Sequence, residues 1–280
     1  MNQIPRIPIG EWIDNGIQYL VDVGSGLTEE ISDFLLDVLS WLQNLLLSIP
    51  PELFLVIIAL LAWRLVNKQV AIFSVAGLFL IYNMQLWPPA MLTLSMVLAS
   101  VLLCIVIGLP LGVLAAKSDM AYRIIMPILD FMQTLPAFVY LLPAIFFFGI
   151  GVVPAIIATL IFSMPPVIRL TNLGIRQVPE ELVELGSSFG STFLQMLVKI
   201  ELPLARPTIM AGINQCIMLS LSMVVIAAMI GAGGLGGEVW RGIQRMEIGL
   251  GFEAGLAIVI MAIVLDRITQ NMGKTNKDGG

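Results

Sequence analysis

Long apolar segments, separated by short charged ones, are the feature of this sequence that most constrains its fold. A helix that crosses a bilayer needs about 20 apolar residues, with a range of about 17 to 25. Lipid offers no partners for backbone polar groups, so helices are the expected spanning structure. The sequence therefore predicts an all-α polytopic membrane protein with about seven transmembrane helices. The expected spans are about 51–66, 70–87, 90–116, 124–150, 152–168, 207–230 and 251–266.

The composition excludes most other classes of protein. Of the 280 residues, 58% are hydrophobic and 12% are charged, whereas soluble domains carry about 25% charged residues. The chain has no histidine, which removes histidine-based acid–base catalysis and imidazole metal sites. Cys104 and Cys216 each lie in an apolar segment, which favours packed side chains over a disulfide or a metal site. A net charge of −5 argues against a nucleic-acid partner.

Basic residues predict the orientation of the chain in the membrane. If the N-terminus is outside, 11 of the 14 Lys and Arg residues fall on the inner side of the predicted spans. Inner loops carry the excess of basic residues, so we predict N-out, C-in topology. Residues 51–272 then form the transmembrane domain, in which residues 169–206 are a cytosolic loop. Residues 273–280 form a short cytosolic tail.

The N-terminal segment, residues 1–50, is acidic and amphipathic. The periodicity of its apolar residues predicts a helix that begins with Thr28 as its N-cap and runs to about Ile49. A shorter helix is expected at about residues 12–21. We expect these helices outside the cell, either at the membrane interface or packed against the rest of the protein.

The cytosolic loop contains two predicted helical arms, which we call the elbow (residues 179–203). Pro179 suits the start of a helix, and Gly190 suits the point at which the chain leaves it, with a positive φ. The second arm is expected to begin at Thr192, and Pro203 is expected to stop it. Both arms are rich in apolar side chains, which favours a protein partner. An amphipathic loop that rests on its own membrane helices is the alternative.

The spacing of Glu184, Gly190 and the sequence Ile200-Glu201-Leu202-Pro203 resembles the cytoplasmic loop motif of ABC-importer permeases. In that family the motif begins Glu-Ala-Ala, whereas Leu185 and Gly186 replace both alanines here. The resemblance extends to the permeases of glycine betaine/proline-type compatible-solute importers, in their Gram-positive short form. It includes QTLPAFVYLLPAIFFFGIGVVP (133–154), MPPVIRLT (164–171) and LSMVVIA (221–227).

The resemblance implies the fold, the activity and the partners. The expected fold is that of a type I ABC-importer permease, and the expected activity is import of glycine betaine or related quaternary-ammonium osmoprotectants across the bacterial plasma membrane. The expected partners are two copies of an ATPase subunit that binds ATP-Mg, a second permease copy in a homodimer, an extracellular binding protein and membrane lipids. The residues expected to couple the chain to the ATPase are Glu184, Gly190, Phe193, Ile200, Leu202 and Pro203.

Two further groups of residues are candidates for the translocation path. Polar residues on the apolar segment after the elbow are expected in the cavity, or alternatively in hydrogen bonds between helices. Glycines further on fit a dinucleotide-binding pattern, which requires a preceding strand and an acidic residue about 20 positions later. Here they follow a membrane segment, so we expect a turn at the external gate. The cavity candidates are Asn214, Gln215, Ser220 and Ser222, and the turn candidates are Gly231, Gly233 and Gly236.

The energy source is predicted from what the sequence lacks. No phosphate-binding loop of the form GxxxxGK[ST] occurs in it, so we expect no enzyme activity from this chain alone and no cofactor bound by it. The alternative is an ion-coupled secondary carrier of small zwitterionic solutes, which usually shows ionisable residues at mid-membrane and inverted repeats. Asp130, Glu253 and Asp266 lie near the predicted ends of the spans, and no repeat is evident.

Overall fold

A computed structural model of the chain describes residues 8–272, and all regular structure within them is helical. The all-α prediction is therefore confirmed. Residues 1–7 and the predicted tail, 273–280, lie outside the described residues.

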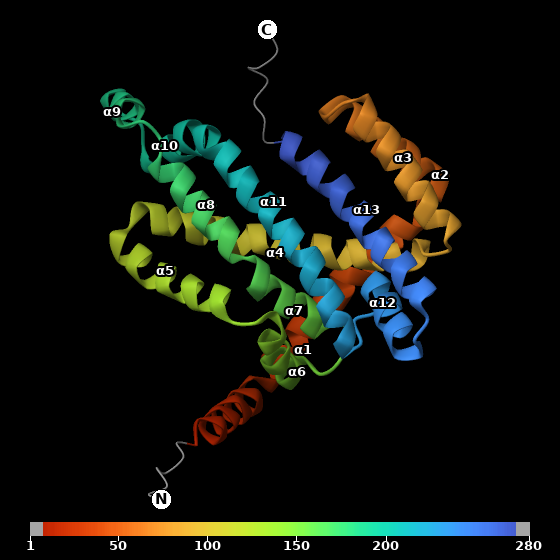
Figure 1. Cartoon of the computed structure of the whole chain (residues 1–280). Coiled ribbons are helices and arrows are strands. Elements are labelled where there is room, and N and C mark those ends of the chain that lie inside the picture. The colour runs from red at the N-terminus through yellow and green to blue at the C-terminus, as the bar shows by residue number, and fades with distance from the viewer. Residues whose placement is uncertain (1–7, 273–280) are drawn as a thin grey trace, which may run out of the picture.

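The helices follow one another with short connections (Figure 1). Their bounds are α1 Ile9–Ser48, α2 Pro51–Leu65, α3 Lys68–Asn83, α4 Trp87–Lys117, α5 Asp119–Thr134, α6 Leu141–Phe148, α7 Val152–Ser163, α8 Pro165–Arg176, α9 Glu180–Ser188, α10 Phe193–Met196, α11 Leu202–Ala227, α12 Gly234–Arg245 and α13 Ile248–Met272. Two 3-10 turns, η1 Ala137–Tyr140 and η3 Ala228–Ile230, and one π turn, η2 Leu197–Glu201, complete the described residues.

By length and composition, the described residues contain four to six candidate membrane spans rather than the seven expected. Four are continuous helical segments: Trp87–Lys117, Val152–Arg176, Phe193–Ile230 and Ile248–Asn271. Two more arise only if a bent pair counts as one span, namely Gly26–Ser48 with α2, bent by 95°, and α5 with Ala137–Phe148, bent by 110°.

The shortfall has two physical causes. The expected spans at 51–66 and 70–87 are α2 and α3, whose 15 and 16 residues reach only about 24 Å at 1.5 Å per residue, against a hydrocarbon core of about 30 Å. The expected span at 124–150 is broken after α5, where Leu135 is extended before Pro136. A residue that precedes proline is disfavoured in the helical conformation, which accounts for the break.

The N-terminal helix differs from its prediction. Instead of two helices with an N-cap at Thr28, α1 is a single helix of 40 residues. The Ser32 hydroxyl donates a 2.8 Å hydrogen bond to the Thr28 carbonyl, as occurs within a helix. The second half of α1 is packed against the protein, where Leu35 and Leu39 are buried in the main core, whereas the Trp12 side chain is 63% exposed.

The centre of the molecule is the packing of α11 against α8, α7, α4 and α13. Glycines permit the closest approaches: a Cβ on Gly112 of α4 would lie 2.6 Å from Thr171 of α8, and one on Gly212 of α11 would lie 2.9 Å from the Pro166 carbonyl. Small residues at helix crossings are typical of membrane bundles. In Figure 1, α2 and α3 lie beside α13 at the right edge, and α9 lies at the upper left, beyond the ends of α8 and α11.

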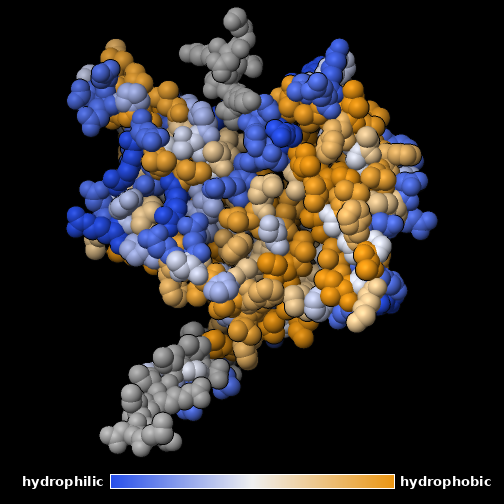
Figure 2. All heavy atoms as spheres, viewed as in Figure 1, coloured by the Kyte–Doolittle hydropathy of each residue, from blue (hydrophilic) through white to orange (hydrophobic). Residues whose placement is uncertain are grey.

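Apolar and hydrophilic residues are concentrated on different parts of the surface. Figure 2 shows mostly apolar residues over the right-hand part of the view, where α2 and α3 lie, and hydrophilic residues over α5 and α8 at the left. At the upper left, where α9 lies, apolar and hydrophilic residues are mixed. The chain thus has one face suited to lipid and one polar flank beside the elbow.

Candidate functional site

The turn of the elbow is built as the sequence predicts. Gly190 has a φ of +72°. Its amide donates to the Ser187 carbonyl at 2.9 Å, and the Ser191 amide donates to the Gly186 carbonyl at 3.1 Å. This pair of hydrogen bonds is a Schellman motif, which satisfies carbonyls at the end of α9 and needs a left-handed residue. A Cβ on Gly190 would meet no atom within 4 Å, so φ alone constrains this position.

Gly186 takes the place of an alanine in the family motif, and the structure gives it a packing role. It is buried where α9 crosses the second arm. A Cβ there would lie 2.7 Å from Cδ1 of Ile200 and 2.8 Å from Cε of Met196. The two arms of the elbow therefore touch at a glycine, which lets α9 lie closer to α10 and η2 than an alanine would without a shift of these side chains.

The second arm continues through Pro203, contrary to the prediction that it stops there. It begins with a capping box, in which Thr192 accepts from the Gln195 amide and the Gln195 side chain accepts from the Thr192 amide at 2.9 Å. The π turn η2 then joins α10 to α11, and Pro203 lies in the first turn of α11. Proline is tolerated in a first turn because its missing N–H needs no partner there. The second arm of the elbow and the membrane helix α11 thus form one 38-residue segment, Phe193–Ile230.

An ion pair that sequence reasoning missed fastens this segment to α4. Glu201 is 2% exposed, and the Lys117 ammonium lies 2.5 Å from its Oε1. The same ammonium lies 6.0 Å from the centre of the Phe193 ring. Oε2 of Glu201 has no hydrogen-bond partner within residues 8–272. Lys117 and Glu201 are 84 positions apart in the sequence, which explains why no local pattern could indicate the pair.

The outer surface of the elbow has an apolar face and, on α9, the exposed carboxylates of Glu180, Glu181 and Glu184. Glu184 is exposed, and the structure of residues 8–272 gives its carboxylate no partner. Phe189 is 83% exposed and Phe193 is 60% exposed. A groove of about 450 Å³ runs along this surface, and its lining includes Leu182, Leu185, Phe189, Ile200, Pro203 and Leu204. The six coupling candidates fall into two sets: Glu184, Gly190 and Phe193 lie on the exposed surface, while Ile200, Leu202 and Pro203 join it to the membrane helix.

The cavity candidates lie on two different faces of α11. Asn214 donates to Oδ1 of Asp266 at 2.9 Å and accepts from Thr269 at 2.6 Å, which ties α11 to α13. Ser220 is fully buried and donates to the Ser163 hydroxyl at 3.0 Å. These two residues therefore make the interhelical hydrogen bonds that the sequence left as an alternative. Gln215 and Ser222 are exposed on this chain.

The glycine-rich turn after α11 combines positive φ with close packing. Gly231 and Gly233 have φ values of +88° and +74°, and Gly236 instead lies against α11, where a Cβ would be 2.8 Å from the Val225 Cα. Sequence reasoning missed Gly234, which has a φ of +67° and would place a Cβ 2.5 Å from Oγ1 of Thr93. A helix, not a strand, precedes the turn, so it does not have the context of a dinucleotide site.

Two ion pairs that the sequence could not indicate join α5 to α8. Arg169 donates to Asp130, and Arg176 donates to Asp119 at 2.8 Å. Arg176 also donates to the Ala115 carbonyl at 3.1 Å. Each pair joins residues at least 39 positions apart, which is why sequence periodicity does not reveal them.

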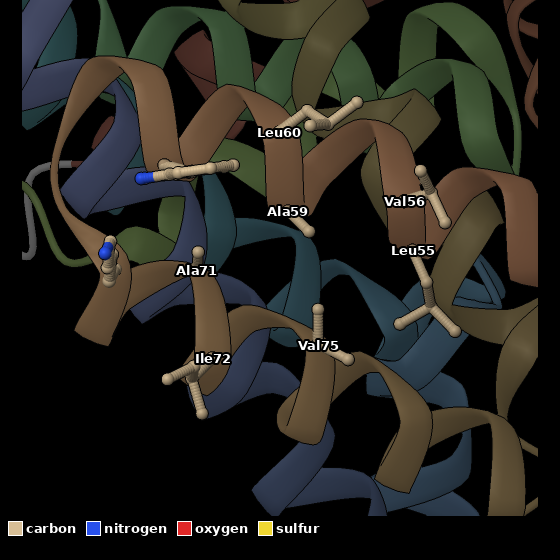
Figure 3. A pocket seen from close by; sticks show the side chains of 9 residues that line it. Leu55, Val56, Ala59, Leu60, Ala71, Ile72 and Val75 are labelled. Carbon is tan, nitrogen blue, oxygen red and sulfur yellow. The ribbon is translucent and has the colours of Figure 1, made fainter.

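An apolar groove of about 470 Å³ lies between α2 and α3 (Figure 3). Small residues, Ala59 and Ala71, line its middle, and Trp63 and Lys68 lie among its lining residues. Such a groove suits the acyl chains of membrane lipids. Within residues 8–272 no group of three Cys, Asp or Glu side chains is placed to hold a metal ion.

Comparisons with known proteins agree with one another. Residues 108–274 match the family described as "Binding-protein-dependent transport system inner membrane component". The chain is 50% identical to the glycine betaine transport system permease protein OpuAB of Bacillus subtilis (strain 168), over 100% of this chain and 99% of the relative. It is 47% identical to the glycine betaine/proline betaine transport system permease protein ProW of Escherichia coli (strain K12), over 98% and 77% respectively.

A solved structure supports the fold. A chain of the inward-facing MetNI methionine ABC transporter superposes with a TM-score of 0.58 at 24% identity, over 65% of this chain and 91% of that one. The likeness at this level of identity concerns the fold alone.

Proposed function

This chain belongs to the family of inner membrane components of binding-protein-dependent transport systems, and on that premise we propose that it imports glycine betaine and related quaternary-ammonium osmoprotectants. It is a multi-pass permease of the cytoplasmic membrane and contains no ATPase domain. The substrate class rests on relatives at 47% to 50% identity that are named for glycine betaine.

The observation that carries the proposal is the elbow. An exposed apolar groove, with the exposed carboxylates of α9 beside it, lies at one end of the continuous segment Phe193–Ile230, which enters the centre of the bundle. Exposed apolar patches rimmed by charge mark protein-interaction sites. The elbow is therefore suited to dock an ATPase and to pass its motion directly to α11.

The mechanism we propose is alternating access. The ATPase subunits bind ATP-Mg and close on one another, which brings two elbows together and opens a cavity to the outside, where a separate binding protein delivers the solute. We propose one elbow from each of two identical permease copies and two ATPase copies. Residues 1–50 are proposed to lie on the outer side of the membrane. The cytosolic loop, predicted at residues 169–206, is proposed to begin where α8 ends, at Arg176.

The test is uptake of radiolabelled glycine betaine by proteoliposomes that contain this chain, its ATPase and its binding protein. Uptake should require ATP on the side of the vesicle membrane that carries the ATPase, with the binding protein on the opposite side. It should not respond to a proton or sodium gradient. Uptake driven by an ion gradient without ATP would overturn the proposal in favour of a secondary carrier.

The coupling role has its own test. Gly190→Val forces a β-branched side chain into a left-handed conformation that costs about 1–2 kcal/mol for a residue with a Cβ, and Glu184→Lys reverses the exposed charge. Both variants should insert into the membrane yet lose transport and co-purify less ATPase. The matched control is Gly249→Val, at a helical glycine where an added Cβ would meet no atom within 4 Å. Normal transport by Gly190→Val with its ATPase bound would contradict the coupling role.

A further inference from the structure

The ion pair between Asp130 of α5 and Arg169 of α8 lies near the end of a candidate membrane span. Arg169 belongs to the candidate span Val152–Arg176 and lies seven residues before its end, about 10 Å along the helix. Asp130 lies 11 residues into α5, about 16 Å from its start. Ionisable residues within membrane segments normally face a polar path or a partner and mark substrate pathways.

The pair is not shielded by its own chain. Asp130 is 65% exposed and Arg169 is 33% exposed. A carboxylate this exposed cannot face hydrocarbon at low cost, so the side of α5 that carries it faces water or another protein chain. The opposite side of α5 is apolar, with Ile124, Ile128 and Phe131 all more than half exposed, and this side suits lipid.

Two buried hydrogen-bond donors on α8 have no partner among the described residues. Among the described residues, Nε of Arg169 is buried without a hydrogen-bond partner, and so is the amide nitrogen of Asn172, which follows one turn later on α8 and is 5% exposed. Buried donors without partners are uncommon in folded proteins. Carboxylate oxygens are strong acceptors for such groups, and a guanidinium binds them with particular geometric fit.

We propose that Asp130 and Arg169 form a transient binding site for zwitterionic solutes in the translocation path, near its cytosolic end. The solute carboxylate displaces Asp130 from Arg169, and the solute cation takes the place of the guanidinium beside Asp130. A molecule with one charge of each sign leaves both side chains paired, whereas a simple cation or anion leaves one of them unpaired. This inference rests on the proposed function, because it assigns a site to the same solutes.

A second ion pair joins the same two helices and supplies a matched control. Asp119 and Arg176 lie 2.8 Å apart at the ends of α5 and α8, where Asp119 is 79% exposed. Arg169, Leu173 and Arg176 are spaced i, i+4 and i+7, so they share one face of α8. If the deeper pair only fastened α5 to α8, removal of either pair should have the same effect on transport.

The first experiment measures uptake of glycine betaine and ATP hydrolysis by the reconstituted transporter. Asp130→Asn and Arg169→Gln should each lower the solute imported per ATP at least tenfold while the ATPase stays bound, and Asp119→Asn should change it less than twofold. Equal losses for Asp130→Asn and Asp119→Asn, or no loss for Asp130→Asn, would overturn the site. Absence of uptake by the unmodified transporter would instead count against the proposed function itself.

The second experiment detects the solute at the site. Leu173 is 44% exposed between the two arginines, and a Leu173→Cys variant of the full transporter can be alkylated from the cytosolic side. Millimolar glycine betaine should slow this alkylation at least threefold, and choline or acetate should not. Arg169→Gln should abolish the protection. Equal protection by choline, or protection that persists in Arg169→Gln, would overturn the proposal.

Discussion

Glycine turns flank the continuous segment Phe193–Ile230 on both sides, but the two turns are constrained in different ways. At the elbow, Gly190 has a positive φ and open space around it, so only its backbone conformation restricts the residue type. At the other end, Gly234 has a positive φ and also lies against Thr93, whose hydroxyl accepts a 2.8 Å hydrogen bond from the Leu235 amide. The first turn leaves its surface available to a partner, whereas the second is fixed to the chain itself.

A glycine turn can thus leave its surface open for a partner to bind, or it can pack against the rest of the chain. The atoms that surround the glycine distinguish the two cases. Elbow residues such as Phe189 and Leu194 are more than 60% exposed, while Leu235 and Gly236 at the other turn are buried. Substitutions at the two ends should therefore separate loss of coupling from loss of stability.

The largest expected effect concerns the side of the membrane on which each end lies. Ser187→Cys, in α9, should react with an impermeant maleimide only after cells are permeabilised. Met246→Cys, at a position that is 88% exposed between α12 and α13, should react in intact cells. The native cysteines are both buried and give little background. The opposite pattern would reverse the orientation and remove the basis for the coupling role.

Next in size is the stability difference between the two glycine turns. Gly234→Val introduces strain of about 1–2 kcal/mol from φ and overpacking of about 1–3 kcal/mol against Thr93. Gly190→Val introduces only the former. The apparent midpoint of thermal unfolding in detergent should therefore fall several degrees further for Gly234→Val. Equal midpoints would show that the outer turn can move away from Thr93, and the contrast between the ends would fail.

An effect of similar size is expected where the elbow is fastened to α4. Lys117→Met leaves the buried Glu201 carboxylate unpaired, and loss of one partner of a buried pair costs about 3–5 kcal/mol. We expect the lower end of that range, because Lys117 is 30% exposed. Glu201→Gln removes the charge itself and should cost less. Denaturant unfolding of the purified chain can rank the two, and a greater loss for Glu201→Gln would contradict the ion-pair interpretation.

The smallest effect is expected at Gly186. Alanine there gains about 0.5–1 kcal/mol in helix preference, while its Cβ must displace the flexible ends of Ile200 and Met196. These terms oppose one another, so the free energy of unfolding should change by less than about 1 kcal/mol. Transport by Gly186→Ala tests whether the close crossing matters to coupling. A loss of stability above about 2 kcal/mol, beyond the usual range for a tolerated core change, would mean that the two arms cannot separate at all.

The conformational preferences of single residues predicted the turn of the elbow correctly, but they did not predict where the neighbouring helices begin and end. A glycine between two helical arms predicted the positive φ at Gly190, because that preference belongs to the residue itself. Pro203 predicted a helix end, and this was wrong because proline is acceptable in the first turn of α11 after the π turn. Likewise, Thr28 satisfies the chemistry of an N-cap, yet it lies inside α1, where nothing interrupts the helix.

Long-range pairing accounts for most of what the sequence could not predict. Polar residues of α11 were recognised, but the periodicity did not show that Asn214 and Ser220 bond to other helices while Gln215 and Ser222 remain exposed. Asp130 was recognised as an acid near the end of a span, whereas its partner Arg169 required the arrangement of α5 against α8.

The π turn Leu197–Glu201 joins the second arm of the elbow to α11. A π turn contains one residue more than the α-helical turn it replaces, and this residue is absorbed within the turn. Deletion of Val198 would therefore restore an ordinary α-helical turn and leave α10 and α11 in nearly the same relative orientation. The elbow can thus gain or lose a residue at this point while the surface that it offers to a partner keeps its direction.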